Sequence, residues 1–410
     1  MSVSLNDSGI PASVLPGVRL PAIVALFAGV FALEIMWTSA EILLPLIGIS
    51  FHVGVGQLGL VVAGFPLGYA ATSIPSGLAV LRWGHRSTLV VGLTIMGGAG
   101  LLALGASSAP ELAALRVVAG AGGGLFFAPS VAFQAELLPP RFRSLVIGLF
   151  VSTGLGFGGA LGFVLGALWG PSFGWAYVFG IAASLTVAVA VVCWLTLPAV
   201  HHPDAPPRPA ERSAVAPRVL RSRSMWGLAV GFMGLSMSIA AGLDFISNYI
   251  HDVHPGWGIS LAGVLGTIAL VTTIPGSLLG TWASERGMDR RVVGVLFTAA
   301  FGALAVAIPF LDPVELVGEF AILGLLGGTT LPIFFEIPSH VPEVQGGGSA
   351  VAVGMLEISQ ALFGGIAAPV FALGVILAGY TWSWIAFGLL AIVTLPALGL
   401  VVPNRAPSPH

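Results

Sequence analysis

The chain has 410 residues, of which 56% are hydrophobic and only 8% are charged, and its formal net charge is −2. A soluble domain carries about 25% charged residues, so this composition excludes a water-soluble enzyme, a disordered chain and a nucleic-acid-binding protein. The lipid bilayer is the expected solvent, and the small net charge predicts no general attraction to nucleic acid.

Twelve apolar runs follow one another along the chain, and each is long enough to cross a bilayer, which takes about 20 helical residues. The first begins near Leu20 and is too long for the core of a signal peptide, so we interpret it as a span. The predicted spans cover residues 21–48, 56–79, 88–107, 111–135, 144–169, 174–198, 225–250, 258–281, 291–311, 314–336, 348–378 and 381–401. They predict an all-α polytopic membrane protein with twelve transmembrane helices.

The positions of the basic residues predict the orientation of the chain. All fifteen are arginine, and if twelve spans alternate, fourteen of them fall on one side, with Arg116 as the exception. Basic residues favour the cytoplasmic side of a membrane. Both termini are therefore expected in the cytoplasm, with the chain crossing the plasma (inner) membrane many times.

The longest polar stretch, residues 199–223, is rich in proline and arginine and lies near the middle of the chain. We interpret it as a cytoplasmic linker between two halves. The predicted organisation is a cytoplasmic tail at 1–19, a six-helix bundle at 20–198, the linker at 199–223, a second six-helix bundle at 224–401 and a cytoplasmic tail at 402–410.

Short motifs of the first half recur in the second half at a nearly constant spacing. The pairs 204 residues apart are Glu111-Leu112 with Glu315-Leu316, Gly120 with Gly324, and Gly123-Gly124 with Gly327-Gly328. Such spacing indicates two parallel repeats of six spans, which is the build of one large class of transporters.

The loop after the second span carries a further motif. Gly77, Arg82, Gly84 and Arg86 occupy the glycine and arginine positions of the pattern G-x-L-A-D-R-x-G-R-R. This pattern is typical of the major facilitator superfamily.

The fourth span carries a second pattern of that family, L-x-x-x-R-x-x-x-G-x-G, as Leu112, Arg116, Gly120 and Gly122. The chain thus resembles the major facilitator superfamily over essentially its whole length. The resemblance implies two parallel-repeat six-helix bundles, transport by alternating access and a monomer.

Two departures from the family's patterns matter for function. Leu81 and His85 stand where the loop motif has an acidic residue and an arginine, so its charge pair is incomplete and Glu136 is the expected substitute. Residues 154–159 lack the Gly-Pro pair that drug–proton antiporters of the family often carry, which weakens an antiporter interpretation.

Ionisable residues inside the spans are the candidates for a proton and substrate pathway, because each costs at least ~2.5 kcal/mol to insert. Glu34 and Glu41 are seven residues apart and share one face of the first span. Arg116 is expected to pair with Glu41. Glu34 has no obvious basic partner and is the expected proton site, because a buried carboxyl can take up a proton near neutral pH.

Five more residues complete the predicted pathway, namely Trp37, Asp244, Asn248, Glu319 and Glu357. Trp37 could stack on an organic ring or cation, and Asn248 follows Asp244 by one turn. The alternative for the charged residues is a set of static ion pairs that tie helices together, and for Trp37 and Asn248 it is helix packing or capping.

A second group of residues is predicted to form gates beside the cytoplasmic loops. Glu136 and Glu336 end the fourth and tenth spans near arginines, so salt bridges that close the inner gate are expected, with solvated charges as the alternative. The gate candidates are Gly77, Arg82, Gly84, Arg86, Glu136, Arg141, Gly280, Gly287, Arg290 and Glu336.

The balance of intramembrane charge predicts the class of substrate. Five carboxyl groups face one arginine, whereas sites for phosphate or dicarboxylates favour arginine clusters. A secondary active transporter for a small neutral or cationic organic solute is therefore favoured, and protons are the expected driving ion. The alternatives are a symporter or facilitator for a small anion centred on Arg116, and a non-transporting sensor on the same fold.

An enzyme is not expected, because the sequence shows no nucleophile, metal or acid–base set. His251 and His254 flank Asp252 in an outer loop, but two histidines and a carboxylate are weak evidence for a metal site. No cofactor and no metal are expected. The expected partners are the lipid bilayer, a small-molecule substrate and protons.

Overall fold

The computed structural model describes residues 19–138, 140–198, 217–286, 288–344 and 349–401. Residues 1–18 of the predicted N-terminal tail, the predicted tail at 402–410 and most of the predicted linker lie outside these residues. Within the described residues the chain is helical and contains no strand, which confirms the all-α prediction. The helices of the first half are α1 (Arg19–Phe51), α2 (Val55–Leu102), α3 (Ala109–Leu137), α4 (Pro140–Thr153), α5 (Gly159–Phe173) and α6 (Trp175–Thr196). Those of the second half are α8 (Arg223–Val253), α9 (Gly258–Glu285), α10 (Arg290–Ala307), α11 (Pro313–Glu336) and α12 (Ser349–Val393).

The number of spans follows from two breaks inside long helices. Eleven segments of the described chain are long and apolar enough to cross a membrane, and the last of them, Gly354–Leu400, has 47 residues. Gly379, with φ of 82°, interrupts this segment, just as Gly84, with φ of 77°, interrupts α2. Both values lie in the left-handed region that glycine adopts without strain. Dividing the last segment at Gly379 gives the twelve predicted spans.

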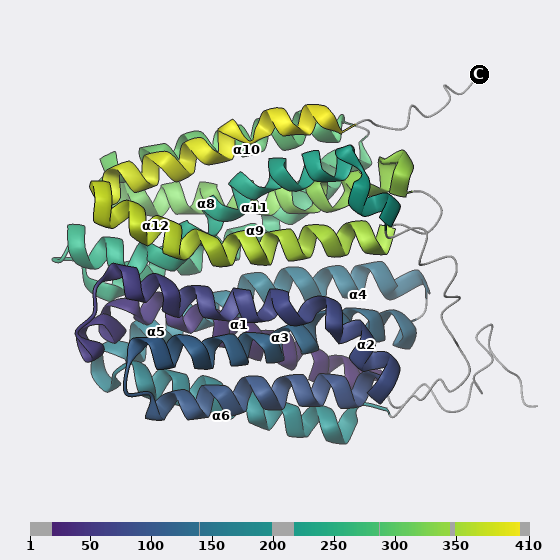
Figure 1. The fold of residues 1–410 in the computed structure, drawn as a ribbon, viewed down its shortest axis with the longest axis horizontal. Helices are drawn as coiled ribbons and strands as arrows, with labels where there is room; N and C mark the ends of the chain where they lie inside the picture. Colours follow the sequence, from purple (N-terminus) through teal and green to yellow (C-terminus); the bar gives the residue numbers. More distant parts are fainter. Residues whose placement is uncertain (1–18, 139, 199–216, 287, 345–348, 402–410) are drawn as a thin grey trace, which may run out of the picture.

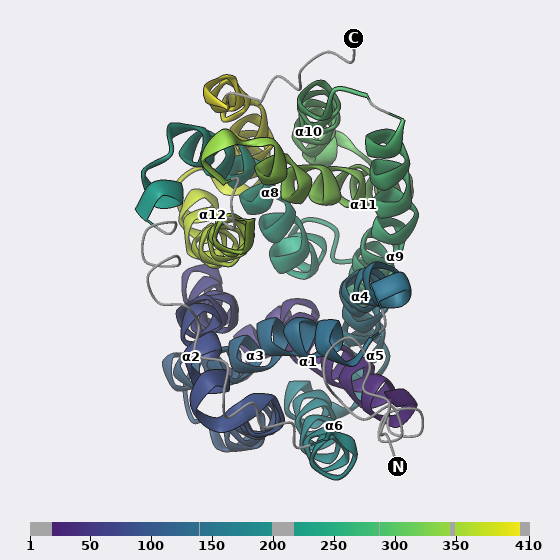
Figure 2. The ribbon, with the colours of Figure 1, turned by 90° about the vertical axis from the view of Figure 1, so that its right-hand side faces the viewer.

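The helices form two groups that run side by side along the long axis of the molecule (Figure 1). Viewed along the helices, α1–α6 make up one group and α8–α12 the other (Figure 2). The repeat predicted from the sequence is visible in the packing of each group. A Cβ on Gly120 would overlap the carbonyl oxygen of Phe65, and a Cβ on Gly324 would overlap that of Ala269, which is 204 residues after Phe65. Glycine thus permits the same close helix approach in both halves.

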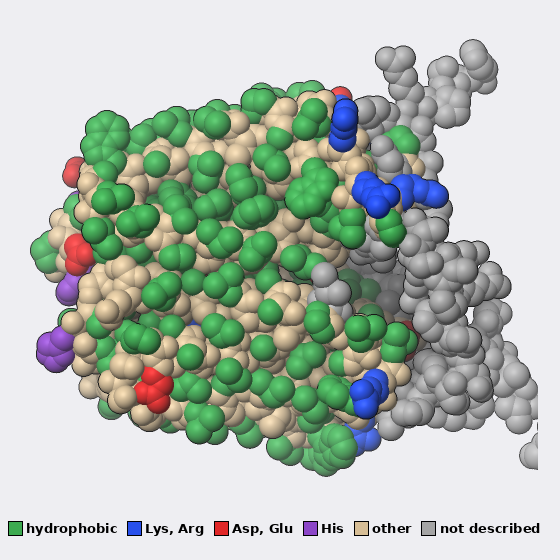
Figure 3. All heavy atoms as spheres, viewed as in Figure 1, with side chains coloured by type: hydrophobic (Ala, Val, Ile, Leu, Met, Phe, Trp, Pro, Cys, Tyr) green, Lys and Arg blue, Asp and Glu red, His purple; other side chains and the backbone are tan. Residues whose placement is uncertain are grey.

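The two ends of the molecule differ in charge. Arginine side chains gather at one end, which we call the arginine-rich end, and acidic and histidine side chains are seen at the other, the opposite end (Figure 3). Apolar side chains cover the flank between them that Figure 3 shows, and several large apolar side chains are highly exposed, such as Leu168 at 65%. This distribution suits helices whose flanks face lipid and whose ends face water.

The halves touch each other near the opposite end. Gly59 of α2 lies against Pro369 and Ala372 of α12, and the ring of Phe163 in α5 fills the space beside Gly266 of α9. Each of these residues lies within about three turns of the opposite end of its span.

The fifth span is irregular where α4 passes into α5. Gly154–Gly158 form a turn of π-helix, a geometry that appears frequently at functional sites. A Cβ on Gly156 would lie 2.7 Å from the side chain of Ile274 in α9, and one on Gly158 would lie 3.0 Å from the Cβ of Glu34 in α1. The π-helical turn is therefore packed between α1 and the other half of the molecule.

Candidate functional site

Arg116 is the buried cation of the molecule's interior, and α3 places it beside α1 and α2. Only 2% of the residue is exposed. Its Nε donates to the carbonyl of Val61 at 2.9 Å, and its Nη1 and Nη2 donate to the carbonyls of Met36 and Trp37, both at 3.2 Å. The guanidinium also lies 5.3 Å from the ring centre of Phe65. These bonds tie three helices of the first half together.

The expected direct pairing of Arg116 with Glu41 is wrong. Among the described residues the ion pairs within 4.0 Å are His85–Glu136 and Arg290–Glu336. Arg116 is instead satisfied by main-chain carbonyls, because the close packing of α1 and α2 on α3 brings these oxygens nearer than the carboxylate. Its charge still acts at longer range on Glu41 and Asp244.

Glu41 and Asp244 bring the two halves into polar contact. Glu41 belongs to α1 and is 2% exposed, whereas Asp244 belongs to α8 and is 4% exposed. Their carboxyl groups interact electrostatically with each other across the two halves. Two ionised carboxylates offer only acceptors, so a hydrogen bond between them requires a bound proton. One turn away, the Ser247 hydroxyl donates to the carbonyl of Glu41.

Two buried oxygens at this contact have no hydrogen-bond partner within the described part of the chain, Glu41 Oε2 and Asn248 Oδ1. Asn248 is 5% exposed and follows Asp244 by one turn of α8. A buried acceptor without a donor is costly. These two oxygens can therefore still accept hydrogen bonds from a donor that binds at the contact between the halves.

Glu34 lies two turns from Glu41 along α1, toward the arginine-rich end, and is 9% exposed. Tyr69 of α2 interacts electrostatically with Glu34 and with Glu357 of α12. Sequence reasoning missed Tyr69. The available signal was a phenolic hydroxyl in an otherwise apolar stretch of the second span.

A row of aromatic rings continues from Tyr69 through the first half. Trp37 lies 5.7 Å from Tyr69, Tyr69 lies 6.2 Å from Phe127, and Phe127 lies 6.0 Å from Phe150. Phe27 ends the row at 5.4 Å from Phe150. Four of these rings are only half-buried, and one member of the row, Tyr69, interacts electrostatically with Glu34.

Glu319 of α11 stands apart from this cluster. It is 9% exposed, and its Oε1 has no hydrogen-bond partner among the described residues. The structure therefore joins Glu41 with Asp244, and Glu34 with Glu357 through Tyr69, but places Glu319 with neither group.

The gate candidates that form ion pairs contact residues of their own half. Arg290 pairs with Glu336 at 2.6 Å, both in the second half, and His85 lies 3.6 Å from Glu136, both in the first half. A salt bridge between Glu336 and a nearby arginine was expected, and the role of these residues in closing an inner gate stays a prediction.

Arg86 contacts neither Glu136 nor the second half. Its Nη2 donates to the carbonyl of Trp194 in α6 at 2.5 Å, and its guanidinium lies 4.2 Å from the centre of the Trp194 ring. Arg86 is therefore held against α6 of the first half.

Arg82 is exposed, and Gly77 has open space where a side chain would project. Gly280 allows α9 to approach the main chain of Thr329 in α11. Gly287 and the side chain of Arg141 lie outside the described residues.

The outer-loop histidines do not gather ligands for a metal. No group of three or more His, Cys, Asp or Glu residues suited to a metal occurs among the described residues. Asp252, between the two histidines, accepts a hydrogen bond of 2.7 Å from the hydroxyl of Tyr380.

Comparison with known proteins gives consistent matches. The model of the Major Facilitator Superfamily matches residues 26–364. A triacylglyceride transporter of Mycolicibacterium smegmatis is 28% identical over 230 residues, which cover 53% of this chain and 36% of that protein. The uncharacterized transporter YybO of Bacillus subtilis is 22% identical over 351 residues, which cover 79% of this chain and 80% of that protein. The chain therefore spans about a third of the first relative and four fifths of the second.

Solved structures share the fold. The crystal structure of a bacterial homolog of the human lysosomal transporter Spinster, inward-facing and occupied, superposes with a TM-score of 0.75 at 17% identity. The alignment covers 94% of this chain and 97% of that chain.

Proposed function

The chain belongs to the major facilitator superfamily, and we propose that it is a proton-coupled secondary active transporter of a small organic solute that is neutral or cationic. The observation that carries the proposal is the contact of two buried carboxyl groups, Glu41 and Asp244, across the two halves. We also propose that both termini face the cytoplasm, as the arginine distribution favours.

Alternating access explains how this contact serves coupling. To open the opposite end, the halves must separate where Glu41 meets Asp244. While the halves touch, a proton between the two carboxyls stabilises the contact, because two bare carboxylates would repel each other. After separation each carboxyl can exchange its proton with water from that side. Proton binding is thereby tied to the closure of the opposite end.

The substrate class follows from the surroundings of Glu34. Glu34, Glu357 and the aromatic row beside Tyr69 combine negative charge with ring faces, which together attract organic cations. Arg116 supports the same conclusion, because three main-chain carbonyls already engage its guanidinium. Because these donors are already used, Arg116 is poorly placed to bind an anionic substrate through two parallel hydrogen bonds. This disfavours the small-anion alternative.

The test is substrate-dependent proton movement in liposomes that contain the purified protein and a trapped pH indicator. Panels of organic amines, neutral solutes and dicarboxylates are added from outside. We expect amines or neutral solutes to cause proton movement, Asp244→Asn to abolish it, and Glu285→Gln, which changes an exposed carboxyl at the arginine-rich end, to leave it intact. Proton movement caused by dicarboxylates alone would support the anion alternative.

A further inference from the structure

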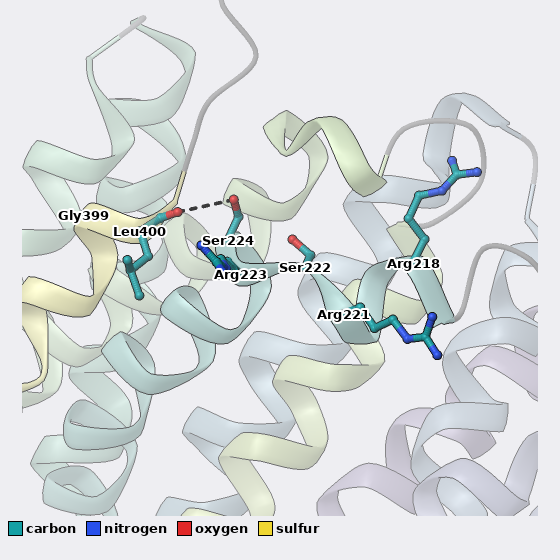
Figure 4. Close-up of a pocket in the computed structure, with 7 residues that line it drawn as sticks. All are labelled: Arg218, Arg221, Ser222, Arg223, Ser224, Gly399 and Leu400. Atoms are coloured by element: carbon teal, nitrogen blue, oxygen red, sulfur yellow. Dashed lines mark hydrogen bonds between the residues drawn. The ribbon is translucent and has the colours of Figure 1, made fainter.

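A cavity of about 530 Å³ lies at the arginine-rich end, where the chain enters the second half (Figure 4). It is formed by the helical turn 217–221, the start of α8 and the segment that follows α12. The residues that matter for its chemistry are Arg218, Arg221, Ser222, Arg223, Ser224 and Leu400.

The cavity is strongly basic. Arg218, Arg221 and Arg223 are all exposed. Among the described residues no acidic side chain lines the cavity, and none of the three arginines forms an ion pair with a carboxylate. The first turn of α8 adds the partial positive charge of a helix N-terminus. The Ser222 side chain caps this turn by accepting a hydrogen bond from the amide of Met225.

Exposed apolar side chains adjoin the arginines. Leu220 and Trp226 are 50% and 53% exposed, and the indole nitrogen of Trp226 donates to the carbonyl of Leu220 at 2.8 Å. Leu400, in the cavity wall, is 57% exposed. Tryptophan at the end of a span marks the level of lipid headgroups, and α8 is the seventh span. The cavity therefore combines cationic and apolar surface at the border of the membrane.

We propose that this cavity binds the phosphate group of an anionic lipid headgroup. Basic pockets between transmembrane helices at a cytoplasmic surface suit such headgroups. The spread of the arginines favours a lipid over a free phosphate ion. Arg223 lies beside Ser224 near Leu400, whereas Arg218 and Arg221 extend to the other side of Ser222 (Figure 4). A free ion is held best by converging donors, but a headgroup at the surface can span separated ones while its chains cover Leu220 and Trp226.

The experiment is native mass spectrometry of the full-length protein in detergent, titrated with phosphatidylglycerol or with phosphatidylcholine. The cavity variant is Arg221→Gln/Arg223→Gln. The matched control is Arg82→Gln/Arg286→Gln, which removes two exposed arginines from the same end but outside the cavity. We expect wild type and control to bind phosphatidylglycerol alike. The cavity variant should bind it about 30-fold more weakly, which corresponds to roughly 1 kcal/mol for each arginine near a charged surface.

Three outcomes would overturn the proposal. Equal losses in both double variants would mean that surface charge in general attracts the lipid. Equal binding of phosphatidylcholine and phosphatidylglycerol would remove the role of the anionic phosphate. In a separate arm, inorganic phosphate is titrated by calorimetry. If it binds wild type as tightly as phosphatidylglycerol does and displaces it, the site is one for a free ion. Thermal unfolding of each variant without added lipid checks that the fold survives.

Discussion

Arg290 of α10 and Glu336 of α11 form an ion pair in which Nη2 and Oε1 are 2.6 Å apart. In the first half, His85 of α2 and Glu136 of α3 lie at the matching end of the bundle, 3.6 Å apart. One half therefore uses a permanent cation at this end, and the other uses a residue whose charge changes with pH.

The Arg290–Glu336 pair should contribute modestly to stability, because both side chains are about a third exposed. We expect Arg290→Gln and Glu336→Gln each to lower the stability of the protein in detergent by about 0.5–1 kcal/mol. The double variant should be no less stable than either single one, since the same contact is lost. Thermal unfolding curves of the three variants check this, and additive losses would show that the residues act separately.

Arg116 should be required for folding more than for substrate binding. Arg116→Ala removes three hydrogen bonds from a buried charged group, and we expect a loss of roughly 3–5 kcal/mol. Arg116→Lys cannot reproduce the fork of donors and should lose part of that stability. Unfolding in detergent measures both variants. If Arg116→Ala is as stable as wild type but no longer binds anions, the anion alternative gains support.

Glu34→Gln separates attraction of the substrate from proton coupling. The carboxamide has the shape of a protonated carboxyl but no negative charge, so the KM for an organic amine should rise, while accumulation driven by a pH gradient, which depends on the proton between Glu41 and Asp244, should persist. Uptake with and without an imposed gradient measures both effects in the same vesicles. Glu285→Gln is the control for the loss of one carboxyl group. Loss of gradient-driven accumulation in Glu34→Gln would place the coupling proton at Glu34 and not at the Glu41–Asp244 contact.

The aromatic row should set the affinity for the organic part of the substrate. Trp37→Leu keeps apolar volume but removes a ring face, and we expect the KM for an aromatic amine to rise about 5- to 20-fold. Tyr69→Phe keeps the row and removes only the hydroxyl between Glu34 and Glu357. Its KM should change less, while its pH dependence should shift. Identical effects of the two changes on KM would argue against a binding role for the rings.

Reporter fusions test the proposed orientation. A reporter after Arg405 should be active on the cytoplasmic side, and one inserted near His254 should be active outside. An external reporter at Arg405 would contradict the proposed orientation, because it would require either an odd number of spans or both termini outside.

The spans and the internal repeat could be predicted because the spans depend on local composition and the repeat depends on the spacing of short motifs. Runs of apolar residues show length directly, and Gly120 and Gly324 recur at a fixed spacing that the packing of α3 and α11 explains. The pairing of Arg290 with Glu336 could also be predicted, because these two residues of opposite charge stand at the ends of consecutive spans.

The partners of Arg116 could not be predicted in the same way. Every residue carries the same carbonyl, so the sequence does not distinguish Val61 or Met36 from their neighbours as acceptors. Tyr69 was missed for a related reason. Its closeness to Glu357 depends on how α2 docks on α12, and the distance of 288 residues between them leaves no local pattern.

The π-helical turn at Gly154–Gly158 has a consequence for the register of the fifth span. A π-helical turn holds one residue more than an α-helical turn. If the turn is taken up into regular α-helix, every residue of α4 shifts by one position relative to α5. One position corresponds to about 100° of rotation and about 1.5 Å of rise. The part of this span at the arginine-rich end can therefore present a different side to its neighbours while α5 stays packed against α9.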